Sequence, residues 1–188
     1  VFLNGEFWYD TYMQSKYSEN YLASAYGMMK NNVLYRRNQE PDAEILQYIA
    51  ENDLASEEAY KEFCELIDVQ SYIDYLCIQV YLANTDVSEK KNTMVFRTYV
   101  NEGTDFGDTR WRWGLYDMDL LTRFSREKYG YQYNAEYNTF ADKGNYVSAI
   151  NEGTLYKALK KNPAFCRQFI LSFMDIVNTD FSILANNC

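Results

Sequence analysis

Hydrophobic residues recur at helical spacing in three neighbouring segments in the first half of the chain. Residues 42–51 carry apolar side chains at positions that share one face of a helix. Two further segments follow Ser56 and Asp68, residue types that commonly cap the start of a helix. The last segment, residues 69–81, is apolar on nearly all sides. This pattern predicts the buried central helix of a helical lobe.

Turn and cap residues predict the remaining elements outside the central region. Asn4-Gly5 favours a type I′ turn, and Gly27 is a typical stop after a helix. Asn162-Pro163 is a typical start, with Pro at the first helical position. The elements predicted in this way are a hairpin over residues 1–13, a helix over 18–26, a strand over 32–37, a short helix over 155–159 and a long helix from 162.

A second hairpin and a long irregular segment complete the predicted architecture. Residues 94–99 and 111–116 are apolar strands on either side of a turn-rich loop. Residues 123–150 are rich in Tyr and lack a sustained period, which predicts a long loop whose tyrosines either dock a substrate or pack over the helical lobe. Because residues 1–3 already read as the interior of a strand, further strands are expected upstream.

These elements predict one α+β domain over residues 1–188. It would have a small β-rich N-terminal part and a larger helical lobe into which the second hairpin is inserted. No internal repeat or linker divides the chain.

Composition narrows the classes of function. The chain has a net charge of −9, which argues against a nucleic-acid partner because phosphate binding needs clustered Lys and Arg. No apolar run approaches the roughly 18 residues of a membrane span. Histidine is absent, which excludes His-based triads and His metal sites. Proton transfer would therefore use carboxylates, Tyr, Lys or Cys.

The four cysteines do not form a recognisable framework. No C-x-x-C spacing indicates a zinc or redox site. Cys64, Cys77 and Cys166 lie within helical patterns and Cys188 ends the sequence, so we interpret them as buried structural thiols. A disulfide between Cys64 and Cys77 stays open, depending on how their helices pack.

The acids best suited to catalysis lie on either side of the second hairpin. Asp86 follows the central helix, and Asn92 comes six positions later. Asp117 and Asp119 follow the second strand of the hairpin. Phosphoryl transfer needs a carboxylate that orients the attacking hydroxyl, together with an Asn and an acid that hold Mg²⁺ against the phosphates. Protein kinases place these residues in the same order.

The two acids after the hairpin have two interpretations. If the strand continued through Met118, Asp117 and Asp119 would point the same way and repel each other unless a cation lay between them. Oxygen ligands of this kind suit Mg²⁺ or Mn²⁺. In the alternative interpretation, Asp86 and these acids are ordinary cap and turn residues.

Several segments, taken in order, resemble one known family. They are residues 1–8, residues 84–86 with Asn92 following, residues 111–119 and residues 155–169. The family is the spore coat protein H (CotH) kinases, and the resemblance covers most of the chain. It implies an atypical protein-kinase-like fold, secreted or spore-associated, that uses ATP and Mg²⁺ or Mn²⁺ to phosphorylate a protein hydroxyl. By position, Asp86 resembles the catalytic acid and Asn92 a metal-binding Asn. Asp117 or Asp119 resembles the metal-binding acid.

Three cations are candidates for contacts with the phosphates of a nucleotide. Arg36 or Arg37 would reach them if the strand over residues 32–37 lies beside the nucleotide, and Lys16 is a further candidate. The alternative is that each is a solvated surface charge.

Two departures from the kinase pattern favour a second hypothesis, a catalytically inactive kinase-like interaction module of a secreted or spore-surface protein. The interval from Asp86 to Asn92 is one residue longer than in protein kinases, and no G-x-G-x-x-G phosphate loop is present. A third interpretation treats Asp117-Met118-Asp119 as the metal and sugar-nucleotide site of a glycosyltransferase. The lack of βαβ alternation argues against it.

Overall fold

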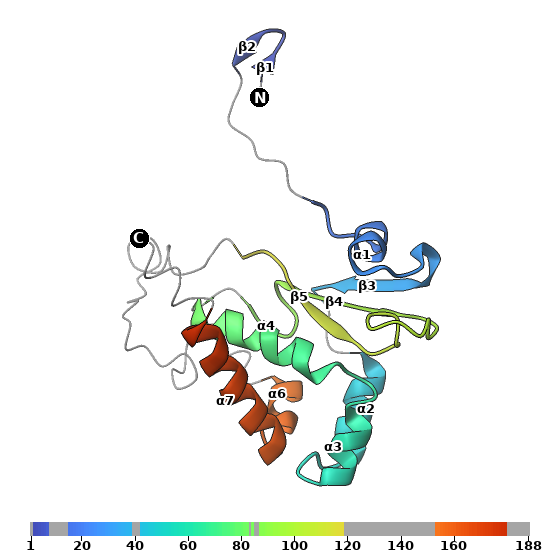
Figure 1. The fold of residues 1–188 in the computed structure, drawn as a ribbon, viewed down its shortest axis with the longest axis vertical. Helices are drawn as coiled ribbons and strands as arrows, with labels where there is room; N and C mark the ends of the chain where they lie inside the picture. Colours follow the sequence, from blue (N-terminus) through green and yellow to red (C-terminus); the bar gives the residue numbers. More distant parts are fainter. Residues whose placement is uncertain are drawn as a thin grey trace.

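A computed structural model describes residues 2–7, 15–38, 42–82, 84, 87–118 and 153–179. Its strands are β1 (Phe2–Leu3), β2 (Glu6–Phe7), β3 (Val33–Arg37), β4 (Thr93–Thr98) and β5 (Arg112–Leu115). Its helices are α1 (Glu19–Tyr26), the short 3-10 helix η1 (Lys30–Asn32), α2 (Ala43–Glu51), α3 (Glu57–Phe63), α4 (Val69–Tyr81), α6 (Thr154–Leu159) and α7 (Pro163–Asn178) (Figure 1). This mixture confirms the α+β class. None of the described helices is long and apolar enough to cross a membrane.

Side-chain caps start most of the helices at the predicted positions. Each cap accepts a hydrogen bond from a main-chain N–H in the first turn, which satisfies a donor that has no partner within the helix. The capping residues are Ser18, Asp42, Ser56, Asp68 and Asn162. Gly27 ends α1 in the left-handed conformation, with a φ of 67°. The predicted first turn is also confirmed, because Asn4 and Gly5 both have positive φ between β1 and β2.

The central sheet joins parts of the sequence that the prediction kept apart. β4 and β5 form the expected antiparallel hairpin, in which Thr93 pairs with Leu115 and Phe96 with Arg112. β3 pairs with the other edge of β4, so the strand order is β3-β4-β5. The hairpin is therefore the continuation of a sheet that begins with β3, and does not belong to the helical lobe alone.

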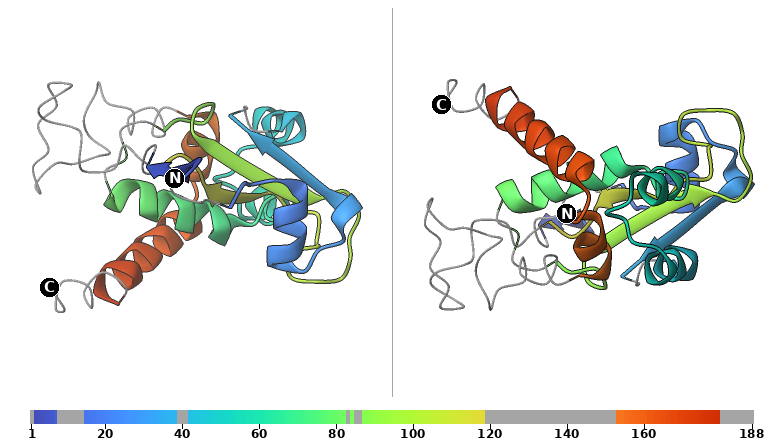
Figure 2. Two further views of the ribbon diagram at one scale, coloured as in Figure 1. Left: turned by 90° about the horizontal axis from the view of Figure 1, so that it is seen from above. Right: turned by 90° about the horizontal axis from the view of Figure 1, so that it is seen from below.

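Alternation of side chains along the strands gives the sheet two apolar faces. One face packs against α1, where Val33, Met94 and Phe96 contact Leu22 and Met28. The opposite face packs against α4 and forms the larger core, which also includes residues of α6 and α7. Figure 1 shows α1 on one side of the sheet and α4, α6 and α7 on the other, and Figure 2 gives two further views. The predicted burial of α4 is confirmed, since Ile73, Leu76 and Cys77 have no exposed surface.

A buried arginine ties β5 to the start of α4. The side chain of Arg112 is 3% exposed. Its Nε lies 3.1 Å from Oδ2 of Asp68, the N-cap of α4. Its two terminal nitrogens donate to the two carboxylate oxygens of Asp108 at 2.7 and 2.8 Å. This bidentate geometry is the strong form of the Arg–carboxylate pair.

The same network makes the stability of the protein depend on pH through Asp108. Burial alone would raise the pKa of Asp108, but hydrogen bonds from Arg112 and Arg110 outweigh it and lower the pKa to about 2. The folded state thus holds this proton less tightly than the unfolded chain, whose value is near 3.8. The stabilisation is present above the unfolded value and is lost as the pH falls through the folded value.

We expect Asp108→Asn to lower the free energy of unfolding at pH 7 relative to the parent protein. The part that depends on ionisation amounts to at most about 2 kcal/mol, and it should shrink as the pH falls from about 4 to about 2. Urea unfolding of both proteins at several pH values in this range measures it. A difference in stability that stays constant with pH would show that ionised Asp108 does not stabilise the fold.

Candidate functional site

The candidate site lies where the chain between α4 and β4 meets the end of β5. Ser88 and Lys91 bond through their backbone N–H and C=O groups in both directions, at 3.0 and 3.3 Å, and so close a tight turn. Asn92 follows this turn and leads directly into β4. Because Thr93 pairs with Leu115, Asn92 and Asp117 lie at the same end of the β4–β5 ladder. The structure thus places two of the predicted metal-binding residues at the same end of the ladder.

Asn92 and Asp117 share an uncommon backbone conformation. Their φ angles are 55° and 53°, in the left-handed region that residues other than Gly rarely adopt. Asn and Asp tolerate this region better than other side chains, which explains their presence here. Asn92 is buried, whereas Asp117 is exposed. Left-handed residues of this kind cluster at functional sites, where surrounding structure holds them in place.

The conformation of Asp117 corrects one step of the prediction. β5 ends at Leu115 and does not continue through Met118. The left-handed turn at Asp117 breaks the alternation of side chains on which the predicted convergence of two carboxylates depended. Asp119 and the predicted catalytic acid Asp86 lie outside the described residues, as does the predicted loop over residues 123–150.

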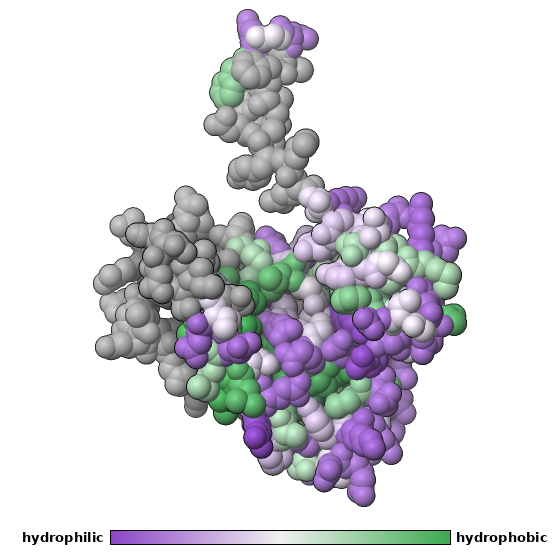
Figure 3. Space-filling view, viewed as in Figure 1, coloured by the Kyte–Doolittle hydropathy of each residue, from purple (hydrophilic) through white to green (hydrophobic). Residues whose placement is uncertain are grey.

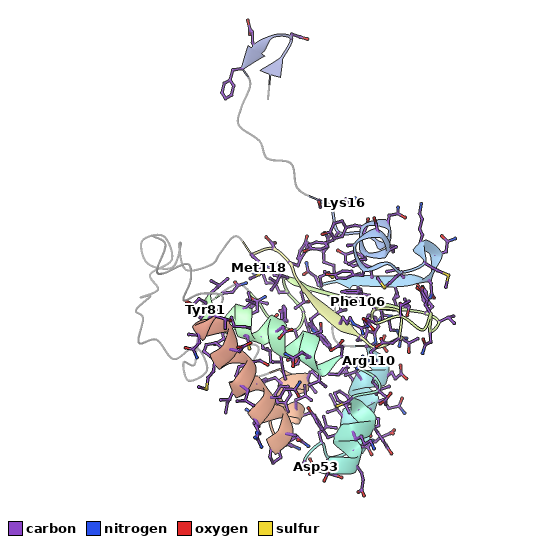
Figure 4. All side chains as sticks on the ribbon, in the orientation of Figure 1. Lys16, Asp53, Tyr81, Phe106, Arg110 and Met118 are labelled. Atoms are coloured by element: carbon purple, nitrogen blue, oxygen red, sulfur yellow. The ribbon has the colours of Figure 1, made fainter. Side chains whose placement is uncertain are left out.

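Met118 anchors the chain after β5 to the end of α4. Its sulfur accepts from Nε2 of Gln79 at 3.5 Å and from Nδ2 of Asn84 at 3.6 Å. Asn84 also donates to Oε1 of Gln79 at 2.7 Å, and both amides are fully buried. Figure 4 labels Met118 beyond the end of β5. This anchor was not predicted, although the position of Gln79 among the apolar residues at the end of α4 was a signal for it.

The three predicted phosphate-binding cations are placed differently. Arg37 donates to the Tyr116 hydroxyl at 2.7 Å, which puts it beside the candidate site. Arg36 points to the other face of the sheet, where it bonds to Asp42 at 2.6 Å. Lys16 is exposed just before α1, and no hydrogen bond or ion pair joins it to the site within the described part of the chain (Figure 4). Only Arg37 is therefore brought to the site by a described contact.

A pocket of about 490 Å³ opens along the outer edge of β5, between α1 and α4. Aromatic side chains and the start of α4 make up most of its walls. Its lining includes Tyr17, Tyr26, Met94, Phe96, Phe106, Trp113 and Leu115, together with Gln70, Ser71, Asp74 and Tyr75 of α4. Figure 3 shows green hydrophobic patches on this side of the molecule, interrupted by pale and purple residues. Volume and lining are those of a small-molecule site.

Polar groups in this pocket come from the edge of β5 and from α4. The Trp113 N–H donates to Oγ of Ser71 at 2.9 Å, so the backbone groups of Trp113 face outward from the sheet. Leu115, two residues further, therefore also presents its N–H and C=O at this edge. Asp74 accepts from Gln70 at 2.6 Å, and no cation pairs with it among the described residues. The pocket thus offers a carboxylate and backbone groups next to aromatic walls.

Other possible sites receive no support from the described residues. No group of three or more His, Cys, Asp or Glu side chains there is arranged to hold a metal ion, although Asp86 and Asp119 fall outside this part of the chain. Cys64, Cys77 and Cys166 are free thiols, so no disulfide joins Cys64 to Cys77. Burial raises the pKa of the Cys77 thiol to about 12, which keeps it protonated and unreactive.

Comparison with known proteins connects this arrangement to a family. No curated protein and no solved structure gave a significant match. The family model described as CotH kinase protein matches residues 3–185, which is nearly the whole sequence. The match includes every element that forms the candidate site. The chain therefore belongs to the CotH kinase family.

Proposed function

We propose that this protein is an atypical kinase that transfers the γ-phosphoryl group of ATP to a protein hydroxyl in a reaction that depends on Mg²⁺ or Mn²⁺. The observation that carries the proposal is the β4–β5 register, in which Asn92 and Asp117 follow the same end of the ladder. Membership of the CotH kinase family supports it. Phosphoryl transfer relies on positioning and on charge stabilisation, so a few well-placed oxygen ligands are sufficient.

Each residue of the site has a distinct role in this proposal. Asn92 and Asp117 hold the metal through an amide oxygen and a carboxylate oxygen, which are ligands that Mg²⁺ and Mn²⁺ prefer. The metal, when bound, neutralises charge that develops on the phosphate oxygens. Asp86 orients the acceptor hydroxyl and takes its proton. Asp119 is a second metal ligand or supports the first. Asn92 and Asp117 both have left-handed backbones, a conformation that persists only where the surrounding structure maintains it.

The pocket along β5 is proposed to receive the nucleoside of ATP. It contains Met94 and Gly114, a pair in the ladder two residues from Asn92. Two residues, Leu115 and Tyr116, separate Gly114 from Asp117. The span is at most roughly 10 Å, which a ribose and its phosphates can bridge. Aromatic walls stack on a planar base, and Asp74 or the Leu115 carbonyl would accept a hydrogen bond from an amino group. Arg37 would then lie near the phosphates.

A second candidate function is a catalytically inactive interaction module. The observation in its favour is the absence of a G-x-G-x-x-G phosphate loop from the sequence. We place the protein, in either case, outside the cell or on the spore or cell surface, by analogy with the family. The antiparallel arrangement of β3, β4 and β5 gives no support to the glycosyltransferase interpretation.

Binding of ATP provides the first test of the proposed function. ATP at about a hundred times its dissociation constant, with Mn²⁺, should stabilise the protein by roughly 2.7 kcal/mol. A thermal-shift series with ATP alone, Mn²⁺ alone and both together measures this. Stabilisation that requires both supports the kinase. No stabilisation under any condition would favour the inactive interaction module.

The role of Arg37 can be tested in the same assay. Arg37→Ala is expected to weaken binding of ATP and Mn²⁺ by about 10- to 100-fold, the usual effect of losing a hydrogen bond to a charged group. Arg167→Ala is the matched control, because Arg167 is an exposed residue of α7 far along the chain from the site. Equal affinities of the two variants for ATP and Mn²⁺ would show that Arg37 does not contact the phosphates.

A further inference from the structure

A glutamate in the turn before Asn92 caps a helix that follows much later in the sequence. Oε2 of Glu89 accepts from the N–H of Thr154, and Oε1 accepts from the N–H of Leu155, both at 2.9 Å. These residues begin α6, whose own N-cap position, Gly153, has no side chain to satisfy them. Glu89 therefore supplies the cap that the local sequence of α6 lacks.

The Glu89 carboxylate packs directly against Gly153. A Cβ atom on Gly153 would overlap the Glu89 carboxylate. Burial raises the pKa of Glu89, while the N–H groups of Leu155 and Thr154 act in the opposite direction. Other groups whose charge reaches this carboxylate are Lys90, Tyr72 and Tyr75. The absence of a side chain at Gly153 therefore leaves the space that the Glu89 carboxylate occupies.

The consequence for the candidate site follows from what the turn connects. Glu89 lies inside the Ser88–Lys91 turn, and Asn92 directly follows Lys91, the last residue of this turn. Fixing the turn at Glu89 fixes the backbone from which Asn92 enters its left-handed conformation. Met118, which follows β5, contacts Asn84, and Thr154, which begins α6, donates to Glu89. Both contacts are made to the short stretch between α4 and β4.

We propose that Glu89 is a positioning residue of the metal site, which clamps the Ser88–Lys91 turn onto the start of α6 and so holds Asn92 beside Asp117. The inference rests on the proposed function, because it assigns Asn92 to the metal. Glu89 itself is a hydrogen-bond acceptor for the protein backbone and does not touch the nucleotide or the metal. A residue that acts in this way through a ligand alters metal affinity by 10- to 100-fold when it is replaced.

The test compares Glu89→Ala, Glu89→Gln and a matched control, Glu58→Ala, which alters an exposed residue in the first turn of α3. We expect Glu89→Ala to weaken Mn²⁺ affinity in the presence of ATP by 10- to 100-fold and to lower kcat, with little change in KM for the acceptor. Glu89→Gln keeps one acceptor oxygen and should recover part of the loss. Glu58→Ala should match the parent protein.

Gly153→Ala provides a second variant that disturbs the clamp without touching the turn. Its new Cβ would displace the Glu89 carboxylate, so it should weaken Mn²⁺ affinity in the same direction. Hydrogen exchange at the amides of Thr154 and Leu155 should speed up in Glu89→Ala and in Gly153→Ala. Faster exchange with unchanged Mn²⁺ affinity and kcat would overturn the proposal, because Glu89 would then be only a helix cap.

Failure of the proposed function gives a different result. If the parent protein does not bind Mn²⁺ with ATP, the kinase proposal fails. The amide NMR signal of Asn92 in the ligand-free protein then tests whether Glu89 positions the backbone at Asn92. A signal that moves in Glu89→Ala but not in Glu58→Ala supports the clamp. A signal that stays in place in both variants would overturn it.

Discussion

Replacing Asp117 by asparagine is expected to lower the rate of metal-dependent phosphoryl transfer by about 10³-fold or more. In the proposed reaction a bound metal would contribute several kcal/mol of charge stabilisation in the transition state, and about 4 kcal/mol corresponds to this factor. Asn tolerates the left-handed backbone that Asp117 adopts, with a φ of 53°, so the variant should keep its fold. The loss would then report the carboxylate charge and not a change in structure.

The measurement for Asp117→Asn combines phosphate transfer from ATP with urea unfolding. Asp105→Asn is the matched control, because Asp105 is exposed in the loop at the opposite end of β4 and β5. We expect unfolding free energies within about 0.5 kcal/mol of the parent for both variants. Transfer at the parental rate by Asp117→Asn would remove this residue from the metal site.

Replacing Arg112 by methionine is expected to destabilise the fold by about 3–5 kcal/mol. Removing one partner of a buried ion pair leaves the other charge poorly compensated. Without Arg112, Asp68 would lose this ion pair and Asp108 would keep its pair with Arg110. Arg112 serves two such partners, Asp68 and Asp108, and its side chain is 3% exposed. Small domains are stable by only about 5–15 kcal/mol in total, so the loss is a large fraction of that stability.

Urea unfolding of Arg112→Met tests this expectation, with Arg110→Met as the control. Arg110 also pairs with Asp108, at 2.6 Å, but its side chain is 36% exposed. Exposed pairs contribute about 0–1 kcal/mol, so the control should lose little stability. Similar losses in the two variants would show that the buried position of Arg112 does not set the strength of the network.

Local signals in the sequence were sufficient for most of the helices. A short polar side chain directly before an apolar stripe can accept a hydrogen bond from a main-chain N–H of the first turn, so it is a strong local signal for the start of a helix. The residues that cap helices in this way are Ser18, Asp42, Ser56, Asp68 and Asn162. The β4–β5 hairpin was predicted for a similar reason, since its two apolar strands are separated by a turn-rich loop. These features depend on neighbours within a few residues.

Contacts between distant parts of the chain were not predictable in this way. The pairing of β3 with β4 depends on how the helices between them fold, and propensity carries no information about that. The left-handed turn at Asp117 and the anchoring of Met118 by Gln79 also arise from tertiary packing. The same holds for Glu89, whose partners on α6 lie more than 60 residues away.

Paramagnetic NMR with Mn²⁺ tests most directly whether Asn92 and Asp117 hold the metal, since it locates the metal in the ATP-bound protein. The same protein with ATP and Mg²⁺ is the diamagnetic control. We predict that the amide signals of Asn92 and Asp117 disappear when Mn²⁺ replaces Mg²⁺. Signals near Thr98, roughly 20 Å along β4, should be far less broadened. Broadening centred elsewhere in the protein, with intact signals from Asn92 and Asp117, would contradict a metal site at this end of the ladder.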